Sequence, residues 1–334
     1  MADTQTAIDR LEEQFLMQMN FSRKYISRVQ TQEQRLAWVK DLVLHMGVEG
    51  HEVLQASGAW KSHRVLQDSF SRSGVVEECV DVYKYLLNIL LTYDVTPDEF
   101  HKAFVDKSHV VELRYEWEQR LKAMHDDINI VGVDLDGILA QYPENWIEYV
   151  NRELGTFYTL ADFYEQSIPL PDIQRDQYEE LKHCYREAGH ESLYVKPFAD
   201  AKQLLDGLKA FGLKIVILSA RPYKQYKRMQ NDTVKWMEHY KLPYDAFIWE
   251  RDKHIKIVEL VPNMACMIDD DLMVANQLSA LDYNVVMRAR PYNQLGDIEN
   301  SRIFRCNGAE EMLKTIGELP FLGTRKRERR KNNE

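Results

Sequence analysis

Two aspartates separated by a single residue follow an apolar run, and they form the most specific chemical signal in the sequence. Asp134 and Asp136 come directly after the uncharged run Ile130–Val133. β-Branched residues and glycine make up this run, which predicts a buried parallel strand. Alternate strand residues share a face, and ligands bind at the carboxyl ends of strands in open α/β sheets, so both acids can reach one site. One carboxylate would act as a nucleophile or metal ligand and the other as an acid and base; the alternative is a solvated turn.

Polar residues follow two later apolar runs in the same way. The runs at 213–218 and 265–268 each predict a further buried strand, and each is followed directly by polar side chains. Between these runs, the short segment 251–256 offers two lysines. The polar residues concerned are Ser219, Lys253, Lys256, Asp269 and Asp270.

This order of motifs, over residues 128–305, resembles that of phosphatases of the haloacid dehalogenase superfamily. The likeness is closest to the deoxyribonucleotidase-like branch. It implies an α/β, Rossmann-like domain, which we expect over residues 126–320. Four motifs carry the resemblance: Asp134-Leu-Asp-Gly-Ile-Leu-Ala140, Ile217-Leu-Ser-Ala-Arg-Pro222, Ile268-Asp-Asp270 and Arg290-Pro-Tyr-Asn293.

The resemblance implies catalytic roles for the conspicuous polar residues. Asp134 is expected to attack phosphorus and form an aspartyl-phosphate. Asp136 is expected to protonate the leaving alcohol and then to activate water. Ser219 and one lysine, either Lys253 or Lys256, would bind the phosphoryl oxygens and stabilise the charge in transfer.

The resemblance also implies a Mg²⁺ site, because this hard cation prefers oxygen ligands. Asp134, the backbone carbonyl of Asp136 and Asp269 are expected to hold the ion. Asp270 either ligates through water or holds Asp269. Arg221 is expected to bind substrate.

Residues 142–196 differ in character, because aromatic and acidic residues dominate there. The segment resembles the small helical cap that covers the active site in the same family and selects the substrate. A nucleotide base would stack on such aromatics, although for any one of them a place in the cap's own core is the commoner outcome. The aromatics are Trp146, Tyr149, Phe157, Tyr158, Phe163, Tyr164, Tyr178 and Tyr185.

The first 125 residues lack β-like runs and predict an all-α helical bundle, so that the chain is multi-domain. Apolar residues recur at intervals of three and four. Thr96-Pro97-Asp98-Glu99 is a strong helix start, with Thr as the cap and Pro in the first helical position. The predicted helices are Thr4–Val29, Gln32–Ala56, Gly74–Tyr93 and Pro97–Met124.

Two pairs of acids stand out on these helices. Glu49 and Glu52 share one helix face, and Glu78 and Asp81 share a face of the next helix. Four acids facing each other would repel unless cations joined them, and a cluster of Mg²⁺ ions is a simple resolution. The alternative is two solvated helix faces, which are common on surface helices.

The paired acids resemble the pattern of all-alpha nucleoside triphosphate pyrophosphohydrolases, which include MazG-like enzymes, dimeric dUTPases and phage dCTPases. In that group a Trp-Lys element follows the first pair and a lysine follows the second. Trp60, Lys61, Arg64 and Lys107 are the corresponding candidates for substrate binding. The Asn that usually follows the late lysine is absent, since Lys107 is followed by Ser108.

Composition narrows the class of protein. The chain has 334 residues, a formal net charge of −10 and no stretch of 18 apolar residues. We therefore expect a cytoplasmic enzyme without a membrane span, in the host cytoplasm if the gene belongs to a phage. Nucleic acid is an unfavourable main partner for an acidic body. The basic tail at 321–334 is predicted to be disordered and solubilising, with a weak contact to an acidic partner as the alternative.

Together the two resemblances predict a bifunctional nucleotide hydrolase with Mg²⁺ in both domains. The helical domain would convert a (deoxy)nucleoside triphosphate to monophosphate and pyrophosphate, and the phosphatase would remove the last phosphate. One alternative is a phosphatase with a nucleotide-sensing helical domain, and another is a polynucleotide 3′-phosphatase. Base and sugar preference, and transfer of the intermediate between sites, stay open.

The third predicted helix is apolar nearly all round, which is typical of a helix buried on every side. One small bundle can hardly cover it, so we expect a homodimer or tetramer joined through residues 30–120.

Overall fold

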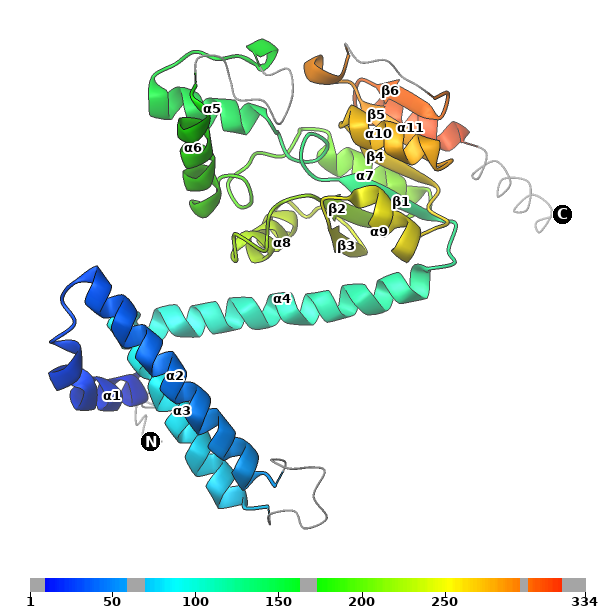
Figure 1. Ribbon diagram of the computed structural model, residues 1–334. Coiled ribbons are helices and arrows are strands. Elements are labelled where there is room, and N and C mark those ends of the chain that lie inside the picture. Colours follow the sequence, from blue (N-terminus) through cyan, green and yellow to red (C-terminus); the bar gives the residue numbers. More distant parts are fainter. Residues whose placement is uncertain (1–9, 59–69, 163–172, 295–299, 320–334) are drawn as a thin grey trace, which may run out of the picture. The chain divides into compact units, whose positions relative to one another are not determined.

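The computed structural model describes residues 10–58, 70–162, 173–294 and 300–319 (Figure 1). The chain divides into two compact units, Met1–Asp106 and Lys107–Glu334. The division falls inside one long helix, α4 (Pro97–Met124), ahead of the domain boundary predicted at residue 125. None of the helices in the described part of the chain is long and apolar enough to cross a membrane.

Four helices account for the N-terminal region, close to the predicted bounds. Side-chain caps define their starts: Thr31 begins α2 with a capping box, and Ser71 accepts a hydrogen bond from the backbone N–H of Gly74. Thr96 and Glu99 exchange reciprocal hydrogen bonds at the start of α4. The first three helices are α1 (Arg10–Ile26), α2 (Gln32–Ala56) and α3 (Arg72–Thr92).

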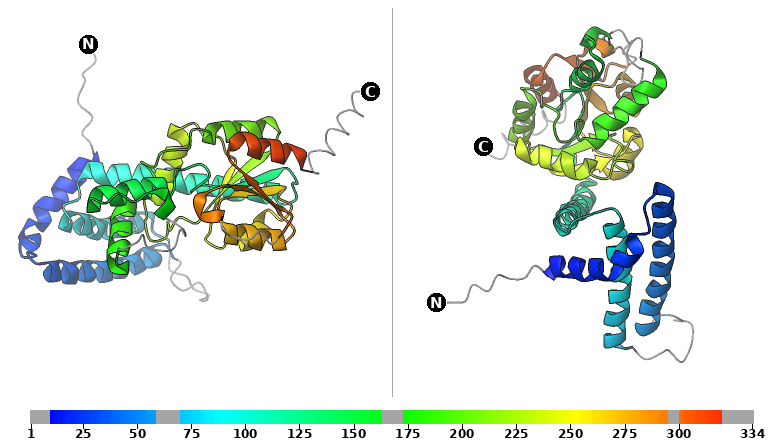
Figure 2. Two further views of the ribbon diagram at one scale, coloured as in Figure 1. Left: turned by 90° about the horizontal axis from the view of Figure 1, so that it is seen from above. Right: turned by 90° about the vertical axis from the view of Figure 1, so that its left-hand side faces the viewer.

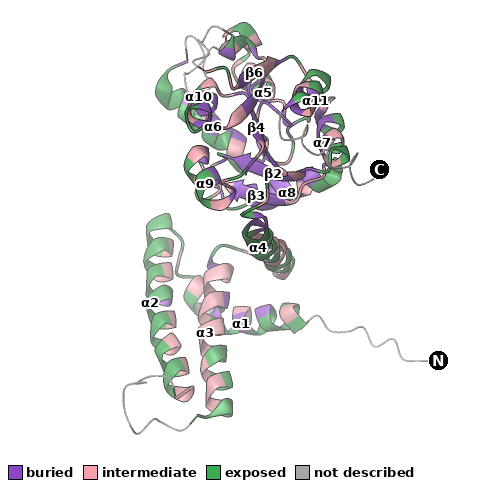
Figure 3. Ribbon diagram, turned by 90° about the vertical axis from the view of Figure 1, so that its right-hand side faces the viewer, coloured by how far each residue is buried: buried purple, intermediate pink, exposed green. Residues whose placement is uncertain are grey.

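Packing within the N-terminal unit is thin. Helices α2 and α3 run side by side and α1 contacts α3 (Figures 1 and 2). Among the residues described in this unit, only Phe15, Leu42 and Leu87 are buried hydrophobics. Most of the other described residues are exposed or half-buried (Figure 3). The described residues therefore confirm a helical N-terminal region; the closed four-helix bundle stays a prediction.

The C-terminal unit is built on a parallel sheet of six strands in the order β3-β2-β1-β4-β5-β6. The central strands are almost entirely buried, as expected for largely apolar runs covered on both faces. The strands are β1 (Ile130–Asp134), β2 (Lys214–Ser219), β3 (Ala246–Trp249), β4 (Cys266–Asp269), β5 (Asn284–Arg288) and β6 (Ile303–Cys306).

Helices cover both faces of this sheet (Figure 3). Helices α7 and α11 pack together on one face, and α9 and α10 pack together on the other. The second half of α4 joins the same core, because Trp117, Leu121 and Met124 are buried in it. The helices are α7 (Ala201–Ala210), α8 (Met229–His239), α9 (Lys253–Leu260), α10 (Leu272–Ala280) and α11 (Ala309–Glu318).

An insert, residues 142–196, lies between β1 and α7 and has a hydrophobic cluster of its own. It contains α5 (Glu144–Leu154), the 3₁₀ turn η1 (Leu160–Asp162) and α6 (Arg175–Glu187). Four of the predicted aromatics, Trp146, Tyr149, Tyr178 and Tyr185, are buried against one another in this cluster. Phe157 is 92% exposed and Tyr158 is half-buried. Phe163 and Tyr164 lie outside the described residues.

Candidate functional site

The functional side chains of the C-terminal unit gather where neighbouring parallel strands end. Asp134 is the last residue of β1, Ser219 the last of β2 and Asp269 the last of β4. Strand β1 lies between the other two, so their carboxyl ends meet at one edge of the sheet. This edge is where open α/β sheets bind ligands.

Three carboxylates form the centre of this site. Asp134, Asp269 and Asp270 are buried, and each offers an oxygen within 4.8 Å of the others. Gly137 makes room for them: its φ is +84°, and a Cβ there would lie 1.9 Å from Oδ2 of Asp270. A side chain at this position would displace the carboxylate, which explains the glycine after the second aspartate.

Lys253 is the buried counter-charge of these acids. Its Nζ lies 2.8 Å from Oδ1 of Asp134 and 2.9 Å from Oδ2 of Asp269. Burial lowers the pKa of Lys253, but the two aspartates more than offset this and leave the pKa above its ordinary value. Lys256, in contrast, pairs with Glu259 at 2.6 Å on the outside of α9. The structure thus brings only one of the two candidate lysines into the site.

The acids carry more negative charge than Lys253 can balance. Burial raises the pKa of Asp134, and burial together with Asp269 raises the pKa of Asp270 to about 8. When all three carboxyls are ionised, one ammonium leaves an excess of two negative charges, which a divalent cation would match. An all-oxygen donor set of this kind fits Mg²⁺.

Asp136 lies apart from the three gathered carboxylates. Arg221 donates to it from two nitrogens, Nε to Oδ2 at 2.9 Å and Nη2 to Oδ1 at 2.7 Å, the bidentate arrangement favoured by guanidinium and carboxylate. Arg221 is buried and also donates to Oγ1 of Thr233 at 2.9 Å. The hydroxyl of buried Ser219 accepts from the backbone N–H of Arg221 at 3.3 Å. Arg221 therefore contacts the candidate acid/base directly.

The helical unit holds a second, more exposed group of acids. Glu49, Glu52 and Glu78 each offer an oxygen within 4.8 Å of the others. Desolvation and then the neighbouring Glu52 raise the pKa of Glu78. Asp81 makes a smaller contribution to that pKa shift and forms its own ion pair with Lys84 at 3.0 Å. The structure thus brings together three of the four predicted acids.

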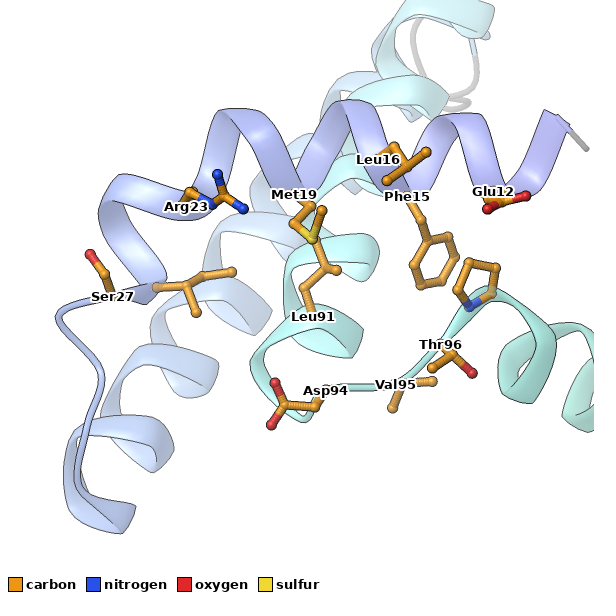
Figure 4. A pocket seen from close by; sticks show the side chains of 12 residues that line it. Glu12, Phe15, Leu16, Met19, Arg23, Ser27, Leu91, Asp94, Val95 and Thr96 are labelled. Carbon is orange, nitrogen blue, oxygen red and sulfur yellow. The ribbon is translucent and has the colours of Figure 1, made fainter.

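The remaining candidates for substrate binding come from the segment after Glu52 and from α4. Lys107 is exposed on α4 and is the first residue of the C-terminal unit. Trp60, Lys61 and Arg64 lie outside the described residues. A cavity of about 520 Å³ opens between α1 and the turn from α3 to α4, with Phe15, Met19 and Leu91 in its wall (Figure 4). None of the three gathered glutamates lines this cavity.

Several residues around the aspartates and in the insert had no predicted role. Tyr292 donates a hydrogen bond to Asp270, and Asn293 donates to the backbone carbonyl of Asp270 at 2.8 Å. Both belong to the Arg290-Pro-Tyr-Asn293 motif, which indicated the family resemblance but did not predict a contact with Asp270. In the insert, Lys182 donates to the hydroxyl of Tyr142 at 2.7 Å and is also fully enclosed, a pairing without a local sequence signal.

Comparison with known proteins identifies a family to which the C-terminal part of the chain is similar. The family model described as 5′ nucleotidase, deoxy (pyrimidine), cytosolic type C protein matches residues 128–312. No curated protein matches the chain significantly.

Several solved structures are similar to the C-terminal part of the chain. A haloacid dehalogenase-like hydrolase from Streptococcus pneumoniae is 16% identical, with a TM-score of 0.41, and the match covers 56% of this chain and 97% of that chain. A protein described as a predicted phosphatase from Clostridium acetobutylicum is 18% identical, with a TM-score of 0.41 and coverage of 57% and 99%. A hydrolase of the haloacid dehalogenase family from Deinococcus radiodurans, with bound phosphate and sodium, is 15% identical, with a TM-score of 0.39. That match covers 58% of this chain and 96% of that chain.

Proposed function

The chain belongs, through residues 128–312, to the family of 5′ nucleotidase, deoxy (pyrimidine), cytosolic type C proteins, and we propose that its phosphatase domain hydrolyses (deoxy)nucleoside monophosphates. The observation that carries the proposal is the buried contact of Asp134 with Lys253 and, through it, with Asp269. This contact supports the proposed roles of Asp134 as nucleophile, of Lys253 as the cation for phosphoryl oxygens and of Asp269 as a metal ligand, because the three side chains form one hydrogen-bonded group.

The reaction takes place in two displacements at phosphorus. An oxygen of Asp134 forms a bond to phosphorus while the bond to the nucleoside oxygen breaks, and Asp136 gives that oxygen a proton. Water then attacks the aspartyl-phosphate, Asp136 takes the proton from water, and orthophosphate leaves with Asp134 restored. Lys253 and Ser219 bind the phosphoryl oxygens in both steps.

The chain's own residues also prepare the site for Mg²⁺, which haloacid dehalogenase hydrolases typically use. Asp134, Asp269 and Asp270, with the backbone carbonyl of Asp136, would hold the ion, which when bound neutralises charge on the phosphoryl group. The bidentate contact with Arg221 holds Asp136 in one orientation. The insert would serve as the cap that excludes water and selects the substrate.

For the helical unit we propose hydrolysis of (deoxy)nucleoside triphosphates to monophosphate and pyrophosphate. The gathering of Glu49, Glu52 and Glu78 supports a Mg²⁺ site there, because three close carboxylates without a cation repel one another. The product of this site would be the substrate of the phosphatase. In the proposed assembly the helical unit also joins the chain into a homodimer or tetramer, which would cover apolar side chains such as Val48, Val76 and Val80.

Product analysis tests the whole proposal. The full chain is incubated with Mg²⁺ and each of the eight common ribo- and deoxyribonucleoside triphosphates, and products are separated by chromatography. Parallel incubations contain the corresponding monophosphates or a 3′-phosphorylated oligonucleotide. Pyrophosphate together with nucleoside supports both sites. Monophosphate hydrolysis without pyrophosphate release supports a phosphatase with a nucleotide-sensing helical domain. Release of phosphate from a 3′-phosphorylated oligonucleotide, with none from mononucleotides, supports a polynucleotide 3′-phosphatase.

A further inference from the structure

One tyrosine touches both the acids of the phosphatase site and the core of the insert. The hydroxyl of Tyr292 donates to the carboxylate of Asp270. Its ring packs against the hydrophobic cluster of the insert, which includes Trp146 and Tyr149. The short 3₁₀ turn that carries it, η2 (Pro291–Asn293), also packs against η1 of the insert. A single side chain therefore spans from a metal-site acid to the insert.

The loop that carries Tyr292 is itself fixed to the site. Asn293 is buried and donates from Nδ2 to the backbone carbonyls of Asp270 and Arg288, each at 2.8 Å. The backbone N–H of Arg290 donates to Oδ1 of Asn293 at 2.9 Å. The position of the Tyr292 backbone relative to Asp270 is thus determined by several hydrogen bonds, and the phenol has little freedom to move away.

A second contact leads from the same loop to the start of the insert. Arg290 is 7% exposed; it donates from Nε to the hydroxyl of Tyr292 at 3.3 Å and from Nη2 to the carboxylate of Glu144. Glu144 is the first residue of α5. A chain of hydrogen bonds therefore runs from Asp270 through Tyr292 and Arg290 to Glu144.

We propose that Tyr292 is a positioning residue that couples cation binding at the aspartates to the seating of the insert. The phenol fixes one oxygen of Asp270, so that the carboxylate keeps the orientation in which it can serve the cation. The same phenol, with Arg290, holds the insert against the site. Residues behind metal ligands commonly change metal affinity by 10- to 100-fold. Coupling of this kind is reciprocal, so the cation must also stabilise the insert.

This inference rests on the proposed Mg²⁺ site, and the experiment separates the two. Mg²⁺ is titrated calorimetrically into the full chain carrying Glu49→Gln, Glu52→Gln and Glu78→Gln, which removes the three gathered carboxylates of the helical unit. In this background we expect Tyr292→Phe to weaken Mg²⁺ binding by roughly tenfold or more. The ring and its packing are kept, so the change tests the hydroxyl.

A matched control and a distant variant complete the design. Tyr283→Phe also removes one hydroxyl from the C-terminal unit, where it donates to the carbonyl of Pro262 at 2.7 Å, and it should bind Mg²⁺ as the parent does. Glu144→Gln should weaken binding several-fold although it contacts none of the aspartates, and its effect should be less than additive with that of Tyr292→Phe. Hydrogen exchange at residues 144–154 should slow on addition of Mg²⁺ in the parent and not in Tyr292→Phe.

The outcomes are distinct. Unchanged Mg²⁺ affinity in Tyr292→Phe, or an unchanged affinity in Glu144→Gln, overturns the coupling and leaves the phosphatase proposal intact. The metal site itself is tested with Asp269→Asn in the same background. If the parent binds no Mg²⁺, or if Asp269→Asn binds it as the parent does, the metal site is overturned. If Tyr292→Phe does not fold, the affinity of Glu144→Gln and the hydrogen exchange of the parent still decide the matter.

Discussion

The two units of this chain both gather three carboxylates, but they hold them by different means. In the C-terminal unit the acids sit at the ends of buried strands, and Lys253 bridges two of them. In the helical unit the acids lie on half-buried or exposed helix faces, and the described core contains only Phe15, Leu42 and Leu87. A rigid sheet can fix like charges close together with one built-in counter-charge. Among the described residues of the helical unit, no buried lysine bridges the gathered glutamates; in the proposal above, a cation supplies the counter-charge.

The largest expected effect separates the units by chemistry. Asp134→Asn should abolish hydrolysis of monophosphates, by at least about 10³-fold, because the nucleophile is lost. Release of pyrophosphate from triphosphates should continue, since that site has its own acids. Both products are quantified on the same preparation, with circular dichroism as a check of folding. Loss of both activities in a folded variant would contradict two independent sites.

The reciprocal change tests the helical unit. Glu49→Gln or Glu78→Gln should stop pyrophosphate release while monophosphate hydrolysis is retained. Glu77→Gln is a matched control, because Glu77 neighbours the cluster on α3 without belonging to it. Pyrophosphate release that survives in both cluster variants would leave the helical unit with a sensing role.

The two lysines of α9 provide a sharper comparison within the phosphatase site. Lys253→Gln should lower kcat/KM by about 10²- to 10³-fold, because a cation on the transferring phosphoryl group is lost. It should also melt at a lower temperature, since it leaves buried carboxylates without their counter-charge. Lys256→Gln, whose side chain pairs with exposed Glu259, should resemble the wild type in both measurements. Equal effects of the two changes would contradict the geometry.

Oligomeric state tests the difference between the helical unit, with few buried hydrophobic residues, and the C-terminal unit, with many. We expect the full chain to be a dimer or tetramer by light scattering and a fragment of residues 107–334 to be monomeric. The fragment begins at Lys107 rather than at 126, because Trp117, Leu121 and Met124 of α4 belong to the C-terminal core. A monomeric full chain at micromolar concentration, or a fragment that keeps the oligomeric state, would refute the proposed interface.

The smallest expected effect is on the pH dependence of stability. The pKa of Glu78 is raised in the folded state by desolvation and by Glu52, so the ionised carboxylate opposes folding. This penalty is present above the raised pKa and is lost as the pH falls through it toward the ordinary value of the unfolded chain. Without Mg²⁺, Glu78→Gln should therefore melt at a higher temperature than the wild type at neutral pH. The difference should shrink on acidification, and a constant difference would count against repulsion in the cluster.

The sequence by itself determined most of the local structure. Caps and apolar spacing placed helices at Gln32–Ala56 and Pro97–Met124 with the bounds that the structure shows. Largely apolar runs marked β1, β2 and β4, and the polar residues at their ends followed from the parallel topology. These features depend on interactions between near neighbours in the chain, and such interactions can be read from spacing.

Only the tertiary structure decided which polar groups meet. Lys253 and Lys256 are one helical turn apart, and the direction of each side chain relative to the sheet selects the first. Arg221 pairs with Asp136, although the two are far apart in sequence. Tyr292 reaches Asp270 through a loop fixed by Asn293, and Asp81 pairs with Lys84 rather than joining the gathered glutamates. Charged side chains are long and each has several possible partners, so only the packed fold, with its burial of charge, selects among them.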